Sequence, residues 1–158
     1  MELQETFTSY VRDQFIDENG RERILKAYDW KTYPPIRSGE RLFNIQDGAV
    51  TYGWVSLTKQ PLCSEYLQST GIYSNYQGKG LMKLVRILAM QKVFEEFGAE
   101  RLSIHILDTN KEYQEHFRTH LPPGWKHGGH VWYPEPAYKI FTITYDAWNE
   151  NKPKYLCR

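Results

Sequence analysis

The segment Gln77-Gly78-Lys79-Gly80 has the residue types and spacing that most clearly indicate chemistry. A strand-like stretch leads into it, and an amphipathic stretch leaves it at Leu81. Glycines let backbone N–H groups approach a ligand without obstruction by a Cβ atom. The first turn of a helix leaves N–H groups unpaired and carries partial positive charge, to which Lys79, Lys83 and Arg86 add. We therefore predict a phosphate-binding turn at the start of a helix.

Two common phosphate motifs do not fit this turn. A P-loop places Lys-Ser or Lys-Thr directly after its last glycine, whereas Gly80 is followed by Leu81. The dinucleotide fingerprint has a third glycine three residues after the second, where this chain has Lys83. The turn is therefore of neither kind.

The segments after the turn alternate between helical and strand periodicity. Apolar residues at helical spacing predict a helix from Leu81 to Phe97, ended by a C-cap at Gly98: these are Leu81, Leu84, Val85, Leu88, Phe94 and Phe97. Alternating Leu102, Ile104 and Ile106 predict a buried strand at 101–107, and a short helix is expected from Lys111 to about Thr119. The turn is thus expected to open a strand–turn–helix–strand–helix unit.

The flanking segments complete one mixed α/β domain over residues 1–158. Residues 41–46 and 49–57 predict a hairpin joined at Asp47-Gly48. A third, irregular strand is expected within 63–73, and a last strand pair at 131–133 and 138–145. Residues 1–30 are predicted to be helical, because helical spacing relates Leu3, Phe7, Tyr10, Val11 and Phe15.

From about Gly53 to Tyr145 the chain resembles the GNAT acyltransferase superfamily. The family pattern Gln/Arg-x-x-Gly-x-Gly/Ala is matched at Gln77 and Gly80, and Met82 departs from it. As in the family, the helix is followed by a strand and then by an asparagine, Asn110, that opens a short helix. Trp125-Lys126 stand where the family shows Gly-Phe and a basic or polar residue. The resemblance implies a twisted mixed sheet with helices on both faces. The strand before the turn and the strand at 101–107 would run parallel, and their ends would splay.

The resemblance also implies acetyl-coenzyme A as the cofactor. Backbone groups of Ile72 and Tyr73 would meet its pantetheine arm, and Asn110 would reach the thioester end. The pyrophosphate would lie against the turn and the first helical residues, namely Gln77, Gly78, Lys79, Gly80, Leu81 and Met82.

Acetyl transfer requires an amine that has lost its proton and benefits from an acid near the departing thiolate. The family commonly supplies a tyrosine seven residues after the asparagine, but this chain has Phe117 there. Tyr113, one turn earlier on the same helix face, is the candidate acid, with core packing as its alternative role. Glu65 and His105 are the candidate bases, with exposed surface as the alternative.

The remaining composition excludes several classes of protein. The net charge of +1 does not indicate a nucleic-acid or membrane surface, and no apolar run is long enough to span a membrane. Cys63 and Cys157 do not form a disulfide framework, so we expect a cytoplasmic protein. No metal site is predicted, because no carboxylate completes the pairs His116/His120 and His127/His130.

Three functional hypotheses stay open at this point. The first is an N-acetyltransferase that acts on a primary amine of a small molecule or a protein. The second keeps the fold but takes a nucleic acid, either a base or an aminoacyl-tRNA. The third is a module that binds acyl-CoA without turnover, suggested by Phe117. The second hypothesis is motivated by the aromatic residues Trp125, Trp132 and Tyr133 and the basic residues Arg118, Lys126 and Lys139. The oligomeric state also stays open, a homodimer included.

Overall fold

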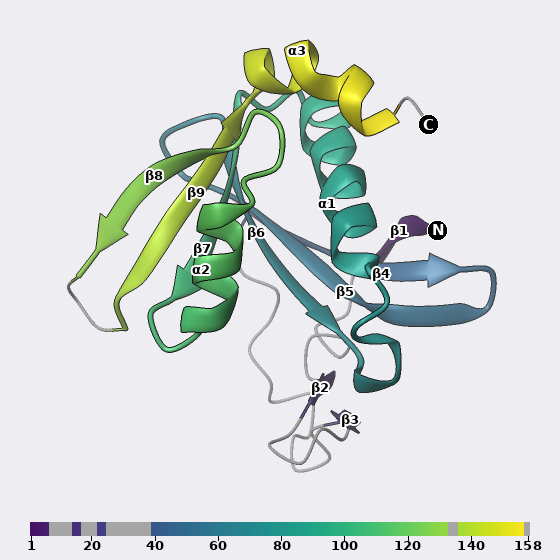
Figure 1. The fold of residues 1–158 in the computed structure, drawn as a ribbon. Helices are drawn as coiled ribbons and strands as arrows, with labels where there is room; N and C mark the ends of the chain where they lie inside the picture. Colours follow the sequence, from purple (N-terminus) through teal and green to yellow (C-terminus); the bar gives the residue numbers. More distant parts are fainter. Residues whose placement is uncertain (7–13, 17–21, 25–38, 133–135, 157–158) are drawn as a thin grey trace.

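The computed structural model describes residues 1–6, 14–16, 22–24, 39–132 and 136–156. These residues form a seven-stranded sheet with three α-helices and a separate two-stranded sheet (Figure 1). The large sheet has the order β1-β4-β5-β6-β7-β9-β8, and β2 pairs with β3. The strands are β1 Glu2–Thr6, β2 Gln14–Ile16, β3 Glu22–Ile24, β4 Glu40–Asp47, β5 Val50–Lys59, β6 Glu65–Ile72, β7 Arg101–Leu107, β8 Lys126–Val131 and β9 Tyr138–Thr144.

The first strand corrects the helical prediction for residues 2–6 alone. Residues Glu2–Thr6 form β1, which pairs antiparallel with β4 and places Leu3 opposite Ile45. Residues 14–16 and 22–24 are also strands, while 7–13, 17–21 and 25–30 lie outside the described residues. Leu3 is buried in the core of the sheet. At Leu3, pairing with a distant strand therefore outweighs the local helical spacing.

The hairpin of β4 and β5 confirms the prediction made from Asp47-Gly48, and Gly48 has a φ of +61°. The third strand, β6, is more regular than expected. It pairs with β5 throughout its length, because Gly71 leaves room for the indole of Trp54. A Cβ atom at Gly71 would lie 2.5 Å from Trp54 Nε1, so a larger residue would break this pairing.

The helix after the turn is α1, Leu81–Gln91, and it continues into a π-helical segment at Lys92–Glu96. Gly98, at a φ of +65°, follows it as the predicted C-cap. The buried residues are Val85, Ala89, Met90, Val93 and Phe94, of which only Val85 and Phe94 belong to the predicted stripe. Leu81, Leu88 and Phe97 of that stripe are partly buried and pack against the same core.

The three described α-helices pack on one face of the sheet (Figure 1). Besides α1 they are α2, Lys111–Thr119, and α3, Tyr145–Leu156. A single apolar core joins Val85 of α1, Phe117 of α2 and Trp148 of α3 to Phe141 of β9. The expected helices on the second face are not among the described residues. None of the described helices could cross a membrane.

The C-terminal region differs from the prediction in two ways. Strand β8 begins at Lys126 instead of near 131, and a bulge between His127 and Gly129 explains its weak strand signal in the sequence. Helix α3 had no clear sequence signal, because it is only weakly amphipathic and contains Pro153. Its position is instead set by Trp148, which is buried in the core.

Candidate active site

The site begins where two parallel strands part. Strands β6 and β7 pair in parallel, as predicted, from Glu65 opposite Arg101 to Gln68 opposite Ile104. Beyond these residues both strands continue without pairing to each other, so their ends diverge. A pocket of about 250 Å³ lies in this gap and is lined from both strands, by Gln68–Thr70 and by Ile104–Leu107. The predicted splay is therefore present.

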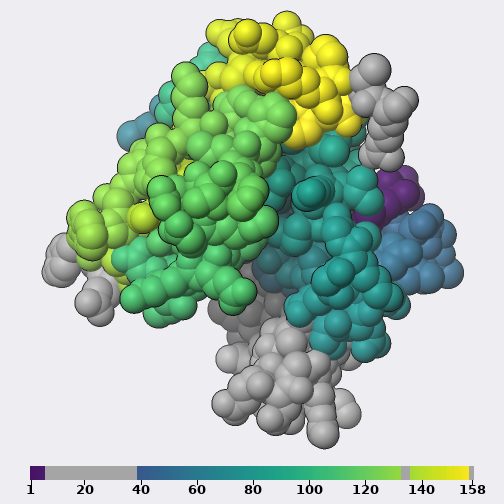
Figure 2. Space-filling view, viewed as in Figure 1, coloured from purple at the N-terminus to yellow at the C-terminus, as the bar shows by residue number. Residues whose placement is uncertain are grey.

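A larger cleft of about 750 Å³ adjoins this pocket. The two share Thr70, Met82, Asn110 and Tyr113 as lining residues, so one continuous hollow runs from the turn before α1 to the parted strands. Figure 2 shows the surface hollowed between the green α2 and the teal α1. The described residues thus form a cavity large enough for an extended ligand.

The turn before α1 has the conformation that its glycines permit. Gly78 and Gly80 both have a φ of +75°, and a Cβ atom at either position would meet nothing within 4 Å. Glycine is therefore favoured here by backbone conformation and not by lack of space. Gly80 is the N-cap of α1, and no side chain caps the helix. The first N–H groups of α1 are consequently available to a ligand in the cleft.

The side chain of Gln77 connects this turn to the end of β6. Its Nε2 donates a hydrogen bond to the carbonyl oxygen of Ile72, 2.9 Å away. Because Ile72 and Tyr73 are both buried, the turn is anchored to a rigid strand end. Except for Lys79, all the residues predicted to contact the cofactor line the larger cleft, namely Ile72, Tyr73, Gln77, Gly78, Gly80, Leu81, Met82 and Asn110.

The opposite wall comes from the start of α2, and hydrogen bonds around Asp108 fix it. Gln114 donates through Nε2 to Asp108 Oδ1 at 3.0 Å and to the carbonyl oxygen of Ile106 at 3.2 Å. His130 Nε2 lies 2.9 Å from both Asp108 carboxylate oxygens. The hydrogen bonds from Gln114 and then His130 hold the pKa of Asp108 below its ordinary value. This network fixes the position of Asn110 at the N-terminus of the helix.

Solved structures with this arrangement were found over most of the chain. A spermidine/spermine N-acetyltransferase from Vibrio cholerae, in complex with manganese ions, matches with a TM-score of 0.68 and 15% identity, covering 94% of this chain and 95% of its own. The spermidine N-acetyltransferase of the same organism, in complex with CoA and spermine, matches with a TM-score of 0.60 and 17% identity, covering 70% and 69%. The chain has the GNAT acetyltransferase fold.

A third match is a putative acetyltransferase from T. thermophilus, with a TM-score of 0.58 and 18% identity, covering 75% of this chain and 66% of its own. Neither a family model nor a curated relative matches the sequence. At these identities the likeness concerns the GNAT fold, while the chemistry must be argued from the residues of this chain.

Tyr113 and Phe117 take different places in this GNAT fold. Tyr113 lines both the cleft and the smaller pocket, whereas Phe117 is 2% exposed and lines neither. The ring of Phe117 packs against Trp125 and Phe141, with centroids 5.7 and 4.7 Å away. Of these two α2 residues, only Tyr113 therefore offers a hydroxyl group at the wall of the cavity.

His105 lines the smaller pocket from β7. Its ring stacks on Tyr138 of β9, with centroids 4.4 Å apart and planes 16° apart. His105 is exposed to solvent on one side, so the contact with Tyr138 desolvates its ring only in part. This partial desolvation lowers the pKa of His105, and the negative charge of Glu65 opposes that shift. The imidazole is therefore neutral near pH 7 and has a nitrogen lone pair to accept a proton.

Glu65 lies at the paired start of β6, away from the diverging end, and it lines neither cavity. Ser103 Oγ donates a 2.6 Å hydrogen bond to Glu65 Oε1, and the Arg101 guanidinium lies 3.8 Å from Oε2. Glu65 therefore borders neither part of the cavity, although its negative charge still acts on His105.

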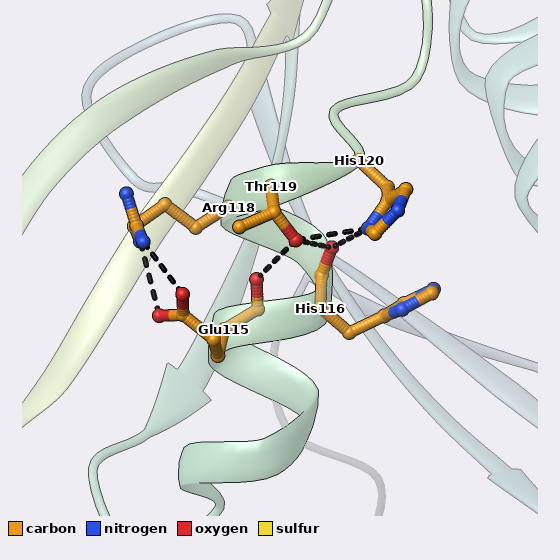
Figure 3. Close-up of polar contacts among 5 residues, drawn as sticks. All are labelled: Glu115, His116, Arg118, Thr119 and His120. Atoms are coloured by element: carbon orange, nitrogen blue, oxygen red, sulfur yellow. Dashed lines mark hydrogen bonds and ion pairs between the residues drawn. The ribbon is translucent and has the colours of Figure 1, made fainter.

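The histidines of α2 form a surface cluster at its C-terminal end (Figure 3). The rings of His116 and His120 stack with centroids 4.8 Å apart. Thr119 Oγ1 lies 2.9 Å from His120 Nδ1, and Arg118 pairs with Glu115. Within the described ranges, no group of three or more His, Cys, Asp and Glu side chains could hold a metal ion.

Several cavity residues were not predicted from the sequence. Trp54 and Tyr76 line the larger cleft, and Gln68 and Arg86 line the smaller pocket. Gly71 opposite Trp54 was the one available signal, because a glycine inside a strand often marks a close approach by another group. Tyr76 and Gln68 have no sequence pattern that sets them apart. Arg86 was expected to add positive charge at the turn before α1, whereas it lines the smaller pocket and not the larger cleft.

Proposed function

We propose that this protein transfers the acetyl group of acetyl-CoA to a primary amine. The observation that carries the proposal is the continuous hollow from the uncapped N-terminus of α1, past Asn110, to Tyr113 and His105. The solved complex of the Vibrio cholerae enzyme with CoA and spermine supports it, since that enzyme has the same fold.

In this proposal the turn and the strand end hold the cofactor. The N–H groups between Gly78 and Met82 would receive the pyrophosphate, because the helix N-terminus combines unpaired donors with a favourable dipole. The buried backbone of Ile72 and Tyr73 would flank the pantetheine arm, and Asn110 would lie near the thioester. Acetyl-CoA supplies the activated acetyl group.

The proton transfers would be divided between two side chains. His105, neutral because burial lowers its pKa, would accept the proton of the amine directly or through water. The amine nitrogen bonds to the acetyl carbonyl carbon, and the carbon–sulfur bond breaks. Tyr113 would donate its hydroxyl proton to the departing sulfur. Glu65 is left out of the mechanism because it lies at the other end of β6.

The test combines binding with turnover. Isothermal titration should detect acetyl-CoA binding, and thiol release should depend on an added amine. We expect Tyr113→Phe to lower turnover about 10²-fold while leaving cofactor affinity nearly unchanged, because the ring remains. Tyr145→Phe is a matched control, since Tyr145 is exposed on α3 and lines neither part of the cavity. A folded protein that does not bind acetyl-CoA would contradict the proposal.

A second candidate is binding of acyl-CoA without turnover, favoured by the buried Phe117 at the place of the family's tyrosine. Tight binding without amine-dependent thiol release would support it. A nucleic-acid acceptor has less support from the surface. Trp125 is only 4% exposed, so it cannot stack on a base, although Trp132 is 72% exposed.

A further inference from the structure

The smaller pocket contains a cation without a matching anion. Arg86 of α1 lines this pocket, and its Cζ atom lies 5.0 Å from the centre of the Phe117 ring. In the described part of the chain, no carboxylate forms an ion pair with Arg86. A guanidinium that packs on an aromatic face keeps its donors free for a carboxylate or a phosphate.

The same pocket contains a buried amide with one polar atom unpaired. Gln68 is 8% exposed, and its Nε2 donates a 2.9 Å hydrogen bond to Thr70 Oγ1. Its Oε1 has no hydrogen-bond partner. Exchanging the amide nitrogen and oxygen would only change which of the two atoms is unpaired. A buried polar atom without a partner is costly, so Gln68 is suited to a polar ligand group in the pocket.

The two carboxylates nearest to this pocket along β7 and β6 are already engaged. Glu65 accepts a hydrogen bond from Ser103 and pairs with Arg101. Asp108 is bound by His130 and Gln114. Neither of them lines the pocket, and its described lining residues include no acidic side chain. The described wall therefore offers no partner for a polycation.

We infer that the acceptor amine carries an anionic group, a carboxylate or a phosphate, which Arg86 binds while Gln68 hydrogen-bonds the same molecule. The inference rests on the proposed acetyl transfer and specifies its acceptor. A preference for an anionic acceptor would distinguish this chain from the Vibrio cholerae enzyme that was solved with spermine. A polyamine would bring several positive charges toward Arg86, whereas an anionic amine would neutralise it.

The experiment compares amines of similar length and different charge. With saturating acetyl-CoA, thiol release is measured for β-alanine, phosphoethanolamine, ethanolamine, putrescine and spermidine. We expect kcat/KM for at least one anionic amine to be about tenfold higher than kcat/KM for ethanolamine. Its advantage over the polyamines should be larger still. The carboxylate and phosphate arms show which anionic group the site prefers.

Variants at the pocket test the role of Arg86. Arg86→Gln should reduce the ratio of kcat/KM for the preferred anionic amine to that for ethanolamine by about tenfold, and Arg86→Lys should restore part of it. Lys126→Gln, an exposed cation on β8 outside the cavity, should leave the ratio unchanged. Titration with CoA should show that cofactor binding survives in every variant.

Different results would overturn different claims. If polyamines are acetylated as well as or better than the anionic amines, or if Arg86→Gln leaves the ratio unchanged, the inference about the acceptor is wrong and acetyl transfer stands. If the wild-type protein binds CoA but releases thiol with none of the amines, the proposal of acetyl transfer to small amines is wrong. The inference about the acceptor is then wrong as well.

Discussion

Replacing Gly80 with aspartate or asparagine separates backbone strain from charge at the N-terminus of α1. Gly80 has a φ of +75°, and a Cβ atom added there would meet no heavy atom within 4 Å. Both variants should cost about 1–2 kcal/mol of left-handed strain, part of which an N-cap hydrogen bond offsets. Since the two side chains have nearly the same shape, both proteins should fold with similar stability.

The two variants should differ in their affinity for CoA. If the pyrophosphate lies at the first N–H groups of α1, the carboxylate introduced by Gly80→Asp would lie about 6 Å from it. At that distance the repulsion is about 1–3 kcal/mol per unit charge, for an effective dielectric constant between that of water and that of a protein surface. Because Gly80 is exposed, the lower end applies. With about two unit charges on the pyrophosphate, the lower end amounts to about 1.5–2 kcal/mol, so we expect Gly80→Asp to bind CoA about 10–30-fold more weakly than Gly80→Asn.

Isothermal titration at two salt concentrations measures this difference. Raising the salt from about 0.1 to about 1 M shortens the Debye length from about 10 to about 3 Å, so the gap between the two variants should narrow. Thermal unfolding of both variants controls for folding. Equal CoA affinities in two folded variants would refute the placement of the phosphates at α1.

Three further predictions concern other parts of the cavity. Lys79→Glu combined with Lys83→Glu should weaken the binding of CoA more than that of pantetheine, which lacks the phosphates. Equal losses of affinity for the two ligands would show that neither lysine contacts the phosphates. Phe117→Tyr should lower the free energy of unfolding by about 1–3 kcal/mol without raising turnover. Phe117 is only 2% exposed, so the added hydroxyl would be buried among aromatic rings. Faster turnover at unchanged stability would contradict this prediction. In the pH profile of kcat/KM, the fall on the acid side should lie below pH 6.5, since desolvation lowers the pKa of His105 from that value. The neutral, active form of His105 is present above its folded-state pKa and is lost as the pH falls through that pKa. His105→Gln should remove this limb, and an identical pH profile in that variant would exclude His105 as the base.

Features that depend on neighbouring residues were predictable from the sequence. Asp47-Gly48 specifies the β4–β5 hairpin, and Gly98 specifies the end of the helical segment after the turn. The turn at Gly78 and Gly80 was recognised because two glycines stand between a strand-like stretch and an amphipathic helix, and the structure gives both glycines a left-handed conformation. Apart from Lys79, the predicted cofactor residues all line the larger cleft, with Asn110 on the wall opposite the turn.

Features that depend on distant partners were not predictable. β1 pairs with β4 although more than thirty residues separate them along the chain, and nothing near Leu3 indicates that pairing. The sequence also placed Glu65 and His105 on neighbouring strands without showing which ends of those strands part. Only the register of β6 and β7 shows that Glu65 lies at the closed end and His105 at the open end.

The departure at Phe117 and the unpaired Arg86 have a common physical explanation. Phe117 and Tyr113 are one turn apart on α2, but only Tyr113 borders the cavity. With Tyr113 as the acid, position 117 requires no hydroxyl and can serve packing, which its burial against Trp125 and Phe141 reflects. A phenylalanine there also offers the guanidinium of Arg86 an aromatic face without competing for its donors. Those donors then remain available to an anionic acceptor, so the loss of the tyrosine and the proposed preference for an anion support each other.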